Sequence, residues 1–175
     1  MKYYCDGSTY MNGQEGQDSS YLVKYDDQII REHLGDFSIN YAELYAIYKA
    51  STLANLGDMI VTDSQIAKIW ATKIMKRKFR ETMPAETIKL REKTFNLVMK
   101  EKFLTITCVP REVNEAGKEI EANPFYGGVE NHKIRLEKWK QTRPKKASKE
   151  KQAYNYFADN YGIDEETIKI KLGIK

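Results

Sequence analysis

The sequence predicts an α/β fold in which a mixed five-stranded sheet carries helices on both faces. Two observations lead to this fold class. The chain opens with three strand-like segments before its first helical pattern, which indicates an antiparallel meander. After that, short apolar strands alternate with helical segments, and a strand–helix–strand order requires parallel pairing through a crossover helix. With 175 residues, 41% of them hydrophobic, the chain has room for one compact domain and a small appendage.

The opening meander is rich in aromatic and β-branched residues, and we expect strands at residues 2–7, 21–25 and 28–34. Gly7 indicates that the first strand ends in a turn. Residues 12–20 are polar and contain glycine, as expected of a loop. Asp26 and Asp27 separate the second and third strands, which favours a hairpin.

The middle of the chain alternates helices and strands. Apolar residues at helical spacing follow Asn40, and we expect Gly57 to end that helix. Residues 59–63 form a short apolar strand, typical of one buried on both faces. A helix is predicted over residues 64–79, with Ser64 as its N-cap.

Three further elements complete the predicted domain. Pro84 introduces an amphipathic helix over residues 85–102. Residues 103–109 are predicted to form the fifth strand. Residues 112–123 are a candidate helix that Gly117 weakens.

The last third of the chain differs in composition. We therefore expect an α/β domain over residues 1–122 and a helical C-terminal extension with a basic linker over residues 123–175. Two short helices are expected around Gly162. A helical cap packed on the domain is favoured over a helix–turn–helix that binds DNA.

Composition limits the functional classes. The formal net charge of +4 permits nucleic-acid binding but does not require it. No apolar run is long enough to cross a membrane, and the N-terminal residues lack the apolar centre of a signal peptide. Cys5 and Cys108 read as small buried hydrophobes in a reducing compartment. We expect a cytoplasmic protein, most simply a monomer.

Three carboxylates are predicted to converge at one edge of the sheet. Asp6 ends the first predicted strand, Asp63 ends the fourth, and Glu43 lies in the first turn of the helix between them. Ligands bind at the carboxyl ends of parallel strands in such sheets. Crowded carboxylates raise one another's pKa unless a cation neutralises them, and all-oxygen ligands suit Mg²⁺ or Mn²⁺. Taken singly, each acid has a structural alternative as a turn residue, a helix-dipole partner or a helix cap.

The segments "YCDGST", "INYAELYAIYKA" and "IVTDSQIAKIW" resemble the three leading motifs of ribonuclease HI. The resemblance covers roughly residues 2–122 and implies a ribonuclease H-like fold. It also implies hydrolysis of the RNA strand of RNA–DNA hybrids with two Mg²⁺ or Mn²⁺ ions, leaving 5′-phosphate and 3′-hydroxyl ends. Asp6, Glu43 and Asp63 stand where the family has metal ligands.

The fourth motif departs from the family. Many members carry an aspartate after Val-Pro-Arg-x-x-Asn-x-x-Ala, whereas alignment here gives either Lys118 or Gly117 at that place. Glu121 shares a helical face with both positions. Our hypothesis is that Glu121 supplies the fourth ligand. The alternatives are Glu119, or a site that has lost its second metal and much of its activity.

Several residues are expected to contact nucleic acid. Asn40 and Gln65 look like the family's polar residues that touch sugars and bases, although capping or solvent exposure would also explain them. The basic run after the second helix would face the DNA backbone through Lys76, Arg77, Lys78 and Arg80.

Two other functions remain open on the sequence alone. One is a ribonuclease H-like DNA nuclease or resolvase, with the same fold and metals. The other is a non-catalytic nucleic-acid-binding domain, in which the altered fourth motif marks lost chemistry.

Overall fold

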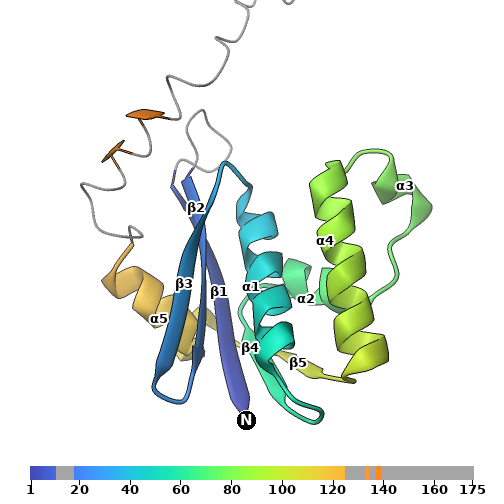
Figure 1. The fold of residues 1–175 in the computed structure, drawn as a ribbon, viewed down its shortest axis with the longest axis horizontal. Helices are drawn as coiled ribbons and strands as arrows, with labels where there is room; N and C mark the ends of the chain where they lie inside the picture. Colours follow the sequence, from blue (N-terminus) through green and yellow to red (C-terminus); the bar gives the residue numbers. More distant parts are fainter. Residues whose placement is uncertain (11–17, 125–132, 135–136, 139–175) are drawn as a thin grey trace, which may run out of the picture. The chain divides into compact units, whose positions relative to one another are not determined.

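A computed structural model describes residues 1–10, 18–124, 133, 134, 137 and 138. It confirms the α/β fold and the mixed five-stranded sheet, whose order is β3-β2-β1-β4-β5 (Figure 1). The strands are β1 (Lys2–Tyr10), β2 (Asp18–Tyr25), β3 (Gln28–Gly35), β4 (Met59–Thr62) and β5 (Thr105–Cys108). The first three pair antiparallel, as predicted for a meander, and β4 pairs parallel with both β1 and β5.

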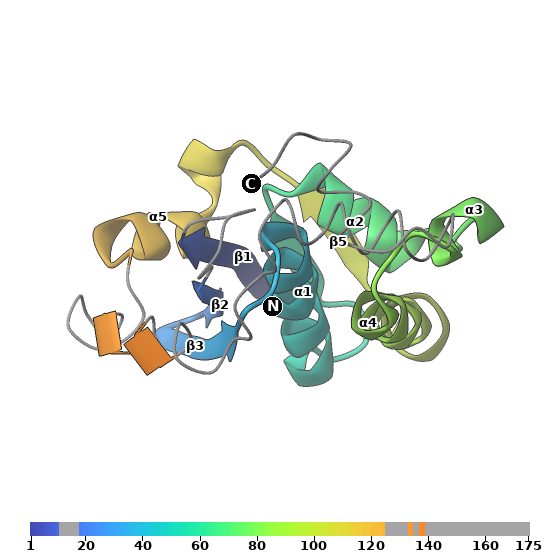
Figure 2. The same ribbon diagram turned by 90° about the horizontal axis from the view of Figure 1, so that it is seen from above.

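The helical elements are α1 (Ile39–Leu53), α2 (Gln65–Thr72), α3 (Arg77–Arg80), α4 (Ala85–Phe95), the π-helix η1 (Asn96–Glu101), the 3₁₀ turn η2 (Arg111–Val113) and α5 (Glu115–Ala122). Apolar side chains of α1, α2 and α4 pack on one face of the sheet. α5 packs on the other face, against β1 and β2 (Figures 1 and 2). Helices therefore cover both faces, as the sequence predicts.

Alternation along β2 shows why two separate apolar cores form. Tyr21 and Val23 are fully buried in the larger core under α1, whereas Leu22 between them is buried under α5. Successive side chains of a strand point to opposite faces. Because both faces are covered, three consecutive apolar residues can all be buried.

The first strand is longer than predicted. β1 continues past Gly7 to Tyr10 and pairs with β2 over that whole length. Gly7 is therefore a strand residue and not a turn, and Asp6 lies in the middle of β1. β2 begins at Asp18, so the end of the predicted loop at residues 12–20 is also strand.

Three predicted helices have different bounds, and α5 begins at Glu115 and not at residue 112, because extended Asn114 separates it from η2. Ser38 caps α1, so Glu43 is its fifth residue and not part of the first turn, and α1 ends at Leu53 before Gly57. The helix predicted over residues 64–79 is interrupted. α2 ends at Thr72, because Lys73 takes an extended backbone conformation, and α3 is a separate short helix.

The extension predicted for residues 123–175 lies almost entirely outside the described residues, so its division from the first domain stays a prediction. Within the described part of the chain, no helix has the length and apolar character needed to cross a membrane.

Candidate active site

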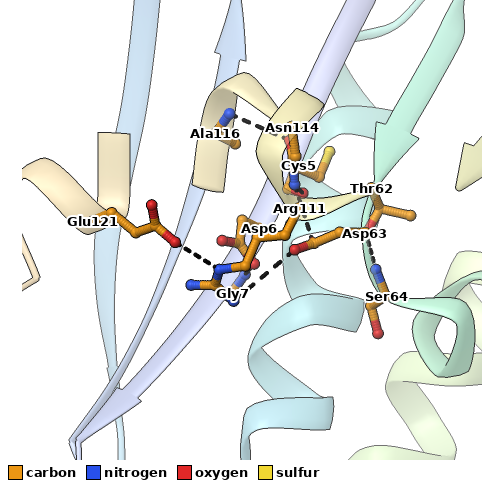
Figure 3. Close-up of polar contacts among 10 residues, drawn as sticks. All are labelled: Cys5, Asp6, Gly7, Thr62, Asp63, Ser64, Arg111, Asn114, Ala116 and Glu121. Atoms are coloured by element: carbon orange, nitrogen blue, oxygen red, sulfur yellow. Dashed lines mark hydrogen bonds and ion pairs between the residues drawn. The ribbon is translucent and has the colours of Figure 1, made fainter. Parts of the chain in front are cut away.

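The parallel pairing of β1 with β4 brings two acids together. Cys5 and Thr62 are the last paired residues of these strands. Asp6 and Asp63 follow them directly, and Figure 3 shows the two side chains near each other at this end of β4. Asp6 and Asp63 therefore lie near each other at the carboxyl end of β4, as the sequence predicts.

Glu43 is held beside β1 by an unusually close approach of α1. A Cβ added at Gly7 would lie 2.4 Å from the backbone nitrogen of Glu43 and 2.7 Å from the carbonyl carbon of Ala42. Only glycine allows backbones to approach this closely. The Gly in the Asp-Gly pair therefore positions Glu43 against the strand that carries Asp6.

Asp6 is a buried carboxyl with a hydrogen-bond partner for only one of its two oxygens among the described residues. Its side chain is 1% exposed, and its Oδ1 accepts a hydrogen bond of 2.8 Å from the backbone N–H of Gly7. Oδ2 is buried and has no hydrogen-bond partner among the described residues. Burial, followed by the charge of Asp63, raises the pKa of Asp6 to about 7, although the charge of Arg111 opposes this shift. An acceptor that is buried and unpaired is costly unless a cation or donor joins it.

The electrostatic setting of Glu43 is similar. Burial raises the pKa of Glu43, and the charge of Asp63 adds to the increase. A hydrogen bond with the Ser64 side chain acts in the opposite direction. The hydroxyl oxygen of Ser64 also accepts from the backbone N–H of Ala67, confirming Ser64 as the N-cap of α2. One serine thus links the start of α2 to a candidate metal ligand.

Arg111 lies among the acids. Its Nε donates to Oε1 of Glu121 over 2.8 Å, and its Nη1 is 4.0 Å from Oδ2 of Asp63. Figure 3 shows the guanidinium between these two carboxylates and close to Asp6. Glu121, the acid predicted as fourth ligand, is therefore linked to Asp63 through an arginine. Its role as a ligand is still a prediction.

The structure also resolves the register of the fourth motif. A Cβ added at Gly117 would lie 3.2 Å from Oδ2 of Asp6, so position 117 of α5 faces this carboxyl. Lys118 is exposed. Glu119, the alternative fourth ligand, forms an ion pair of 3.0 Å with Lys24 on β2. Glycine therefore occupies the helical position from which an acid would reach Asp6.

The predicted nucleic-acid contacts are spread along the surface. Asn40 is half-buried at the start of α1, and Gln65 is exposed as the first residue of α2. The basic run forms or precedes α3, where Lys76, Arg77 and Arg80 are exposed. Arg77 lies 3.9 Å from Glu81, and Arg80 is paired with Glu92. The backbone of Lys78 belongs to α3, and its side chain lies outside the described part.

The donor set fits a hard divalent cation. Asp6, Glu43 and Asp63 offer only oxygen, and Oδ2 of Asp6 is an unpaired buried acceptor. Each acid is engaged separately, Glu43 by Ser64 and Asp63 by Asn114 and Arg111. Among the described residues, no three His, Cys, Asp or Glu side chains are gathered into a ready-made metal site. The acids would have to move closer together to share an ion.

Sequence reasoning assigned no role to Asn114 or Arg111. Asn114 is fully buried and caps α5, with its Oδ1 accepting from the backbone N–H of Ala116. Its Nδ2 donates to the carbonyl of Cys5 over 3.0 Å and to Oδ1 of Asp63 over 3.1 Å. The signal that would have found both residues is their place in Val-Pro-Arg-x-x-Asn, next to the missing aspartate.

Residues 1–115 match the RNase H family. No curated protein matches the chain. Among solved structures, a foamy viral protease–reverse transcriptase in complex with dsDNA is similar, with 17% identity, a TM-score of 0.52, and coverage of 71% of this chain and 94% of that one. RNase H1 from the archaeon Halobacterium salinarum is 18% identical, with a TM-score of 0.48 and coverage of 67% and 91%. LC11-RNase H1 in complex with an RNA/DNA hybrid is 16% identical, with a TM-score of 0.48 and the same coverage of 67% and 91%.

Proposed function

Because the chain belongs to the RNase H family, which its residues 1–115 match, we propose that it is a metal-dependent endoribonuclease that hydrolyses the RNA strand of RNA–DNA hybrids. The observation that supports this most directly is the group formed by Asp6, Glu43 and Asp63. Burial, together with the charge of Asp63, raises the pKa of both Asp6 and Glu43, and a bound cation would favour the charged form of both carboxyls.

Asp6, Glu43 and Asp63 would hold the ions, and Glu121 is the proposed fourth ligand. Two divalent ions, when bound, supply activation of the attacking water and stabilisation of the leaving 3′-oxygen. The protein's own contribution is to hold the carboxylates in place. Gly7 fixes Glu43 against β1, and Asn114 holds Asp63 beside it.

Substrate choice is proposed to depend on shape and charge. An RNA–DNA hybrid displays 2′-hydroxyls in a wide minor groove. Asn40 and Gln65 would contact sugars and bases there, and the basic run of Lys76, Arg77, Lys78 and Arg80 would contact the DNA backbone. A cytoplasmic location and a monomeric state also remain predictions.

A cleavage assay tests this function. The full chain is offered hybrid, duplex DNA, duplex RNA and single strands with Mg²⁺, with Mn²⁺ or with EDTA. Cleavage of the hybrid alone, dependent on metal, is the expected result. Asp63→Asn should abolish cleavage while leaving hybrid binding and the fold intact. Cleavage of duplex DNA would favour the resolvase-like alternative, and hybrid binding without cleavage would favour a non-catalytic domain.

The fourth ligand has its own test. Glu121→Gln should lower the rate of cleavage about tenfold or more, which corresponds to roughly 1.4 kcal/mol at the transition state. Glu119→Gln is the comparison variant: Glu119 pairs with Lys24 on β2, so its rate should stay near that of the parent, and a loss confined to Glu119→Gln would move the role to this alternative ligand. An unchanged rate in Glu121→Gln would remove this residue from the site.

A further inference from the structure

A cavity of about 380 Å³ lies between α2, α4 and the segments that follow them. Figures 1 and 2 place α3 and α4 at the opposite end of the domain from α5, and the cavity contains none of the candidate metal ligands. Its volume is within the range of small-molecule sites. Its lining includes Trp70, Lys73, Arg91, Phe95, Asn96 and Lys100.

Arg91 is a buried cation that lines this cavity. Its side chain is only 5% exposed, and its guanidinium lies 5.1 Å from the centre of the Trp70 ring. Nε is buried without a hydrogen-bond partner, and no carboxylate within the described ranges forms an ion pair with this arginine. Burial lowers the pKa of Arg91. The Trp70 ring offsets part of the cost of burying this charge. Because the cation has no carboxylate partner among the described residues, the site favours a ligand that brings negative charge.

Most of the other charged residues around the cavity are also positive. Lys73, Arg80 and Lys100 join Arg91 on its walls, and Glu92 is the acid among its lining residues. Glu92 is already paired with Arg80. Two lysines and Arg91 are therefore left to attract an anion, and an arginine is well suited to bind phosphate oxygens.

The remaining walls suit a flat apolar group. Trp70 and Phe95 supply aromatic surface. Arg91 lies over the Trp70 ring and Lys100 over the Phe95 ring, so a base would pack on the parts of the rings that these cations leave uncovered. Ile74 also lines the cavity, with a side chain that is 81% exposed. Asn96 offers an amide that can both donate and accept hydrogen bonds. It is the first residue of the π-helix η1, an element often found at functional sites. A phosphate joined to a planar base with polar edges matches all of these features.

We propose that this cavity is a nucleotide-binding site, separate from the carboxylate site, in which Arg91 binds the phosphate and the aromatic walls receive the base. The ligand of this site would have the chemistry of a single nucleotide. It could be a free nucleoside monophosphate or one nucleotide within a single strand. This nucleotide site does not depend on the proposed nuclease activity, because it contains none of the candidate metal ligands and needs no metal; Arg80 is the residue that it shares with the basic run.

Calorimetry on the full chain in EDTA tests the site with adenosine 5′-monophosphate, adenosine and inorganic phosphate. We expect the monophosphate to bind about tenfold or more tightly than either fragment. Arg91→Met should weaken this binding about tenfold or more, because it removes a charged hydrogen-bond donor. Lys89→Met is the matched control, since Lys89 is an exposed cation on the same helix. Its affinity should stay within about twofold of the parent.

A fluorescent deoxyadenosine hexamer, followed by anisotropy, distinguishes the two sources. Tighter binding of the hexamer than of the monophosphate, lost in Arg91→Met, assigns the site to single strands, and the reverse order assigns it to free nucleotides. Three results would overturn the proposal: Lys89→Met loses as much affinity as Arg91→Met, adenosine binds as tightly as its monophosphate, or none of the probes binds.

Two further variants separate folding and catalysis from this site. If Arg91→Met does not fold, the double variant of Lys73→Met and Lys100→Met changes only exposed cations of the cavity and carries the same expectation. Asp63→Asn should bind the monophosphate like the parent. A negative result for nucleotide binding at the cavity therefore does not count against the proposed nuclease activity. Likewise, absence of cleavage does not count against the nucleotide site.

Discussion

The side-chain amide of Asn114 donates a hydrogen bond of 3.1 Å to Oδ1 of Asp63. The same Nδ2 donates to the carbonyl of Cys5, and Oδ1 caps α5 at Ala116. One fully buried side chain therefore connects β1, the end of β4 and the start of α5. Through this connection, the side chain of Asp63 is tied to β1 and α5.

Replacing Asn114 should affect both stability and catalysis. Asn114→Ala removes the cap and leaves the carbonyl of Cys5 without this donor, so we expect the free energy of unfolding to fall by about 2–3 kcal/mol. Cleavage of hybrid should fall as well, because Asp63 loses its anchor. Urea unfolding and a cleavage assay measure the two effects.

Ser38→Ala is the control for capping alone, since Ser38 caps α1 through the backbone N–H of Tyr41. It should cost about 1 kcal/mol. If Asn114→Ala were no worse than this control in either assay, the bond to Asp63 would have no positional role.

The raised pKa of Asp6 predicts how stability depends on pH in EDTA. An unfolded aspartate releases its proton near pH 4, whereas folded Asp6 keeps it up to about pH 7. Between these values folded Asp6 binds more protons than unfolded Asp6, so the contribution of this residue to stability should fall as pH rises from 4 to 7. Asp6→Asn should flatten this dependence and raise the free energy of unfolding at pH 8 by up to about 4 kcal/mol. Urea unfolding across this pH range is the measurement, and an unchanged slope in Asp6→Asn would contradict the assignment.

Restoring an acid at Gly117 should strengthen metal binding. Gly117→Asp places a carboxylate beside Oδ2 of Asp6, from a Cβ only 3.2 Å away. In EDTA the added repulsion should make this variant less stable than Gly117→Ala, which has the same Cβ contact. With Mg²⁺ the order should reverse. Each kcal/mol added to the free energy of unfolding corresponds to a rise of about 3 °C in melting temperature, which is the measurement. An equal response of both variants to Mg²⁺ would show that position 117 does not reach the ions.

Gly7→Ala should displace α1. The added Cβ would meet the backbone of Glu43 at 2.4 Å, so we expect a loss of about 3 kcal/mol together with reduced cleavage. Gly57→Ala is the control, because Gly57 has a φ of +85° but open space around its Cα. This control should cost about 1 kcal/mol without affecting cleavage. Thermal melting and the hybrid assay together distinguish a local clash from backbone strain.

The order of the strands and the meeting of Asp6 with Asp63 were predictable, because period and composition identify a meander followed by crossover units. The length of β1 was not. From the sequence alone, Gly7 looks like a turn residue. Glycine is needed at this position because the backbone of α1 lies close to it. Contacts between distant segments leave no local pattern.

The end of α2 and the fourth motif were unpredictable for different reasons. No glycine or proline marks Lys73, where the helix ends. For the fourth motif, two registers were equally acceptable, and only the packing of α5 on β1 selects Gly117 as the residue that faces Asp6. Arg111 was overlooked because a cation among candidate metal ligands is unexpected from charge patterns alone.

The length of β1 has a consequence for how the acids can adjust. Asp6 is paired with Leu22 in the middle of a strand that continues in both directions, so its backbone is clamped. Asp63 lies beyond the end of β4, and Glu121 lies at the end of a short helix. Any rearrangement on ion capture must then come from residues 63 and 111–121 moving towards a stationary Asp6. Crystals grown with and without Mn²⁺ should superpose along residues 2–10 and diverge in that second group.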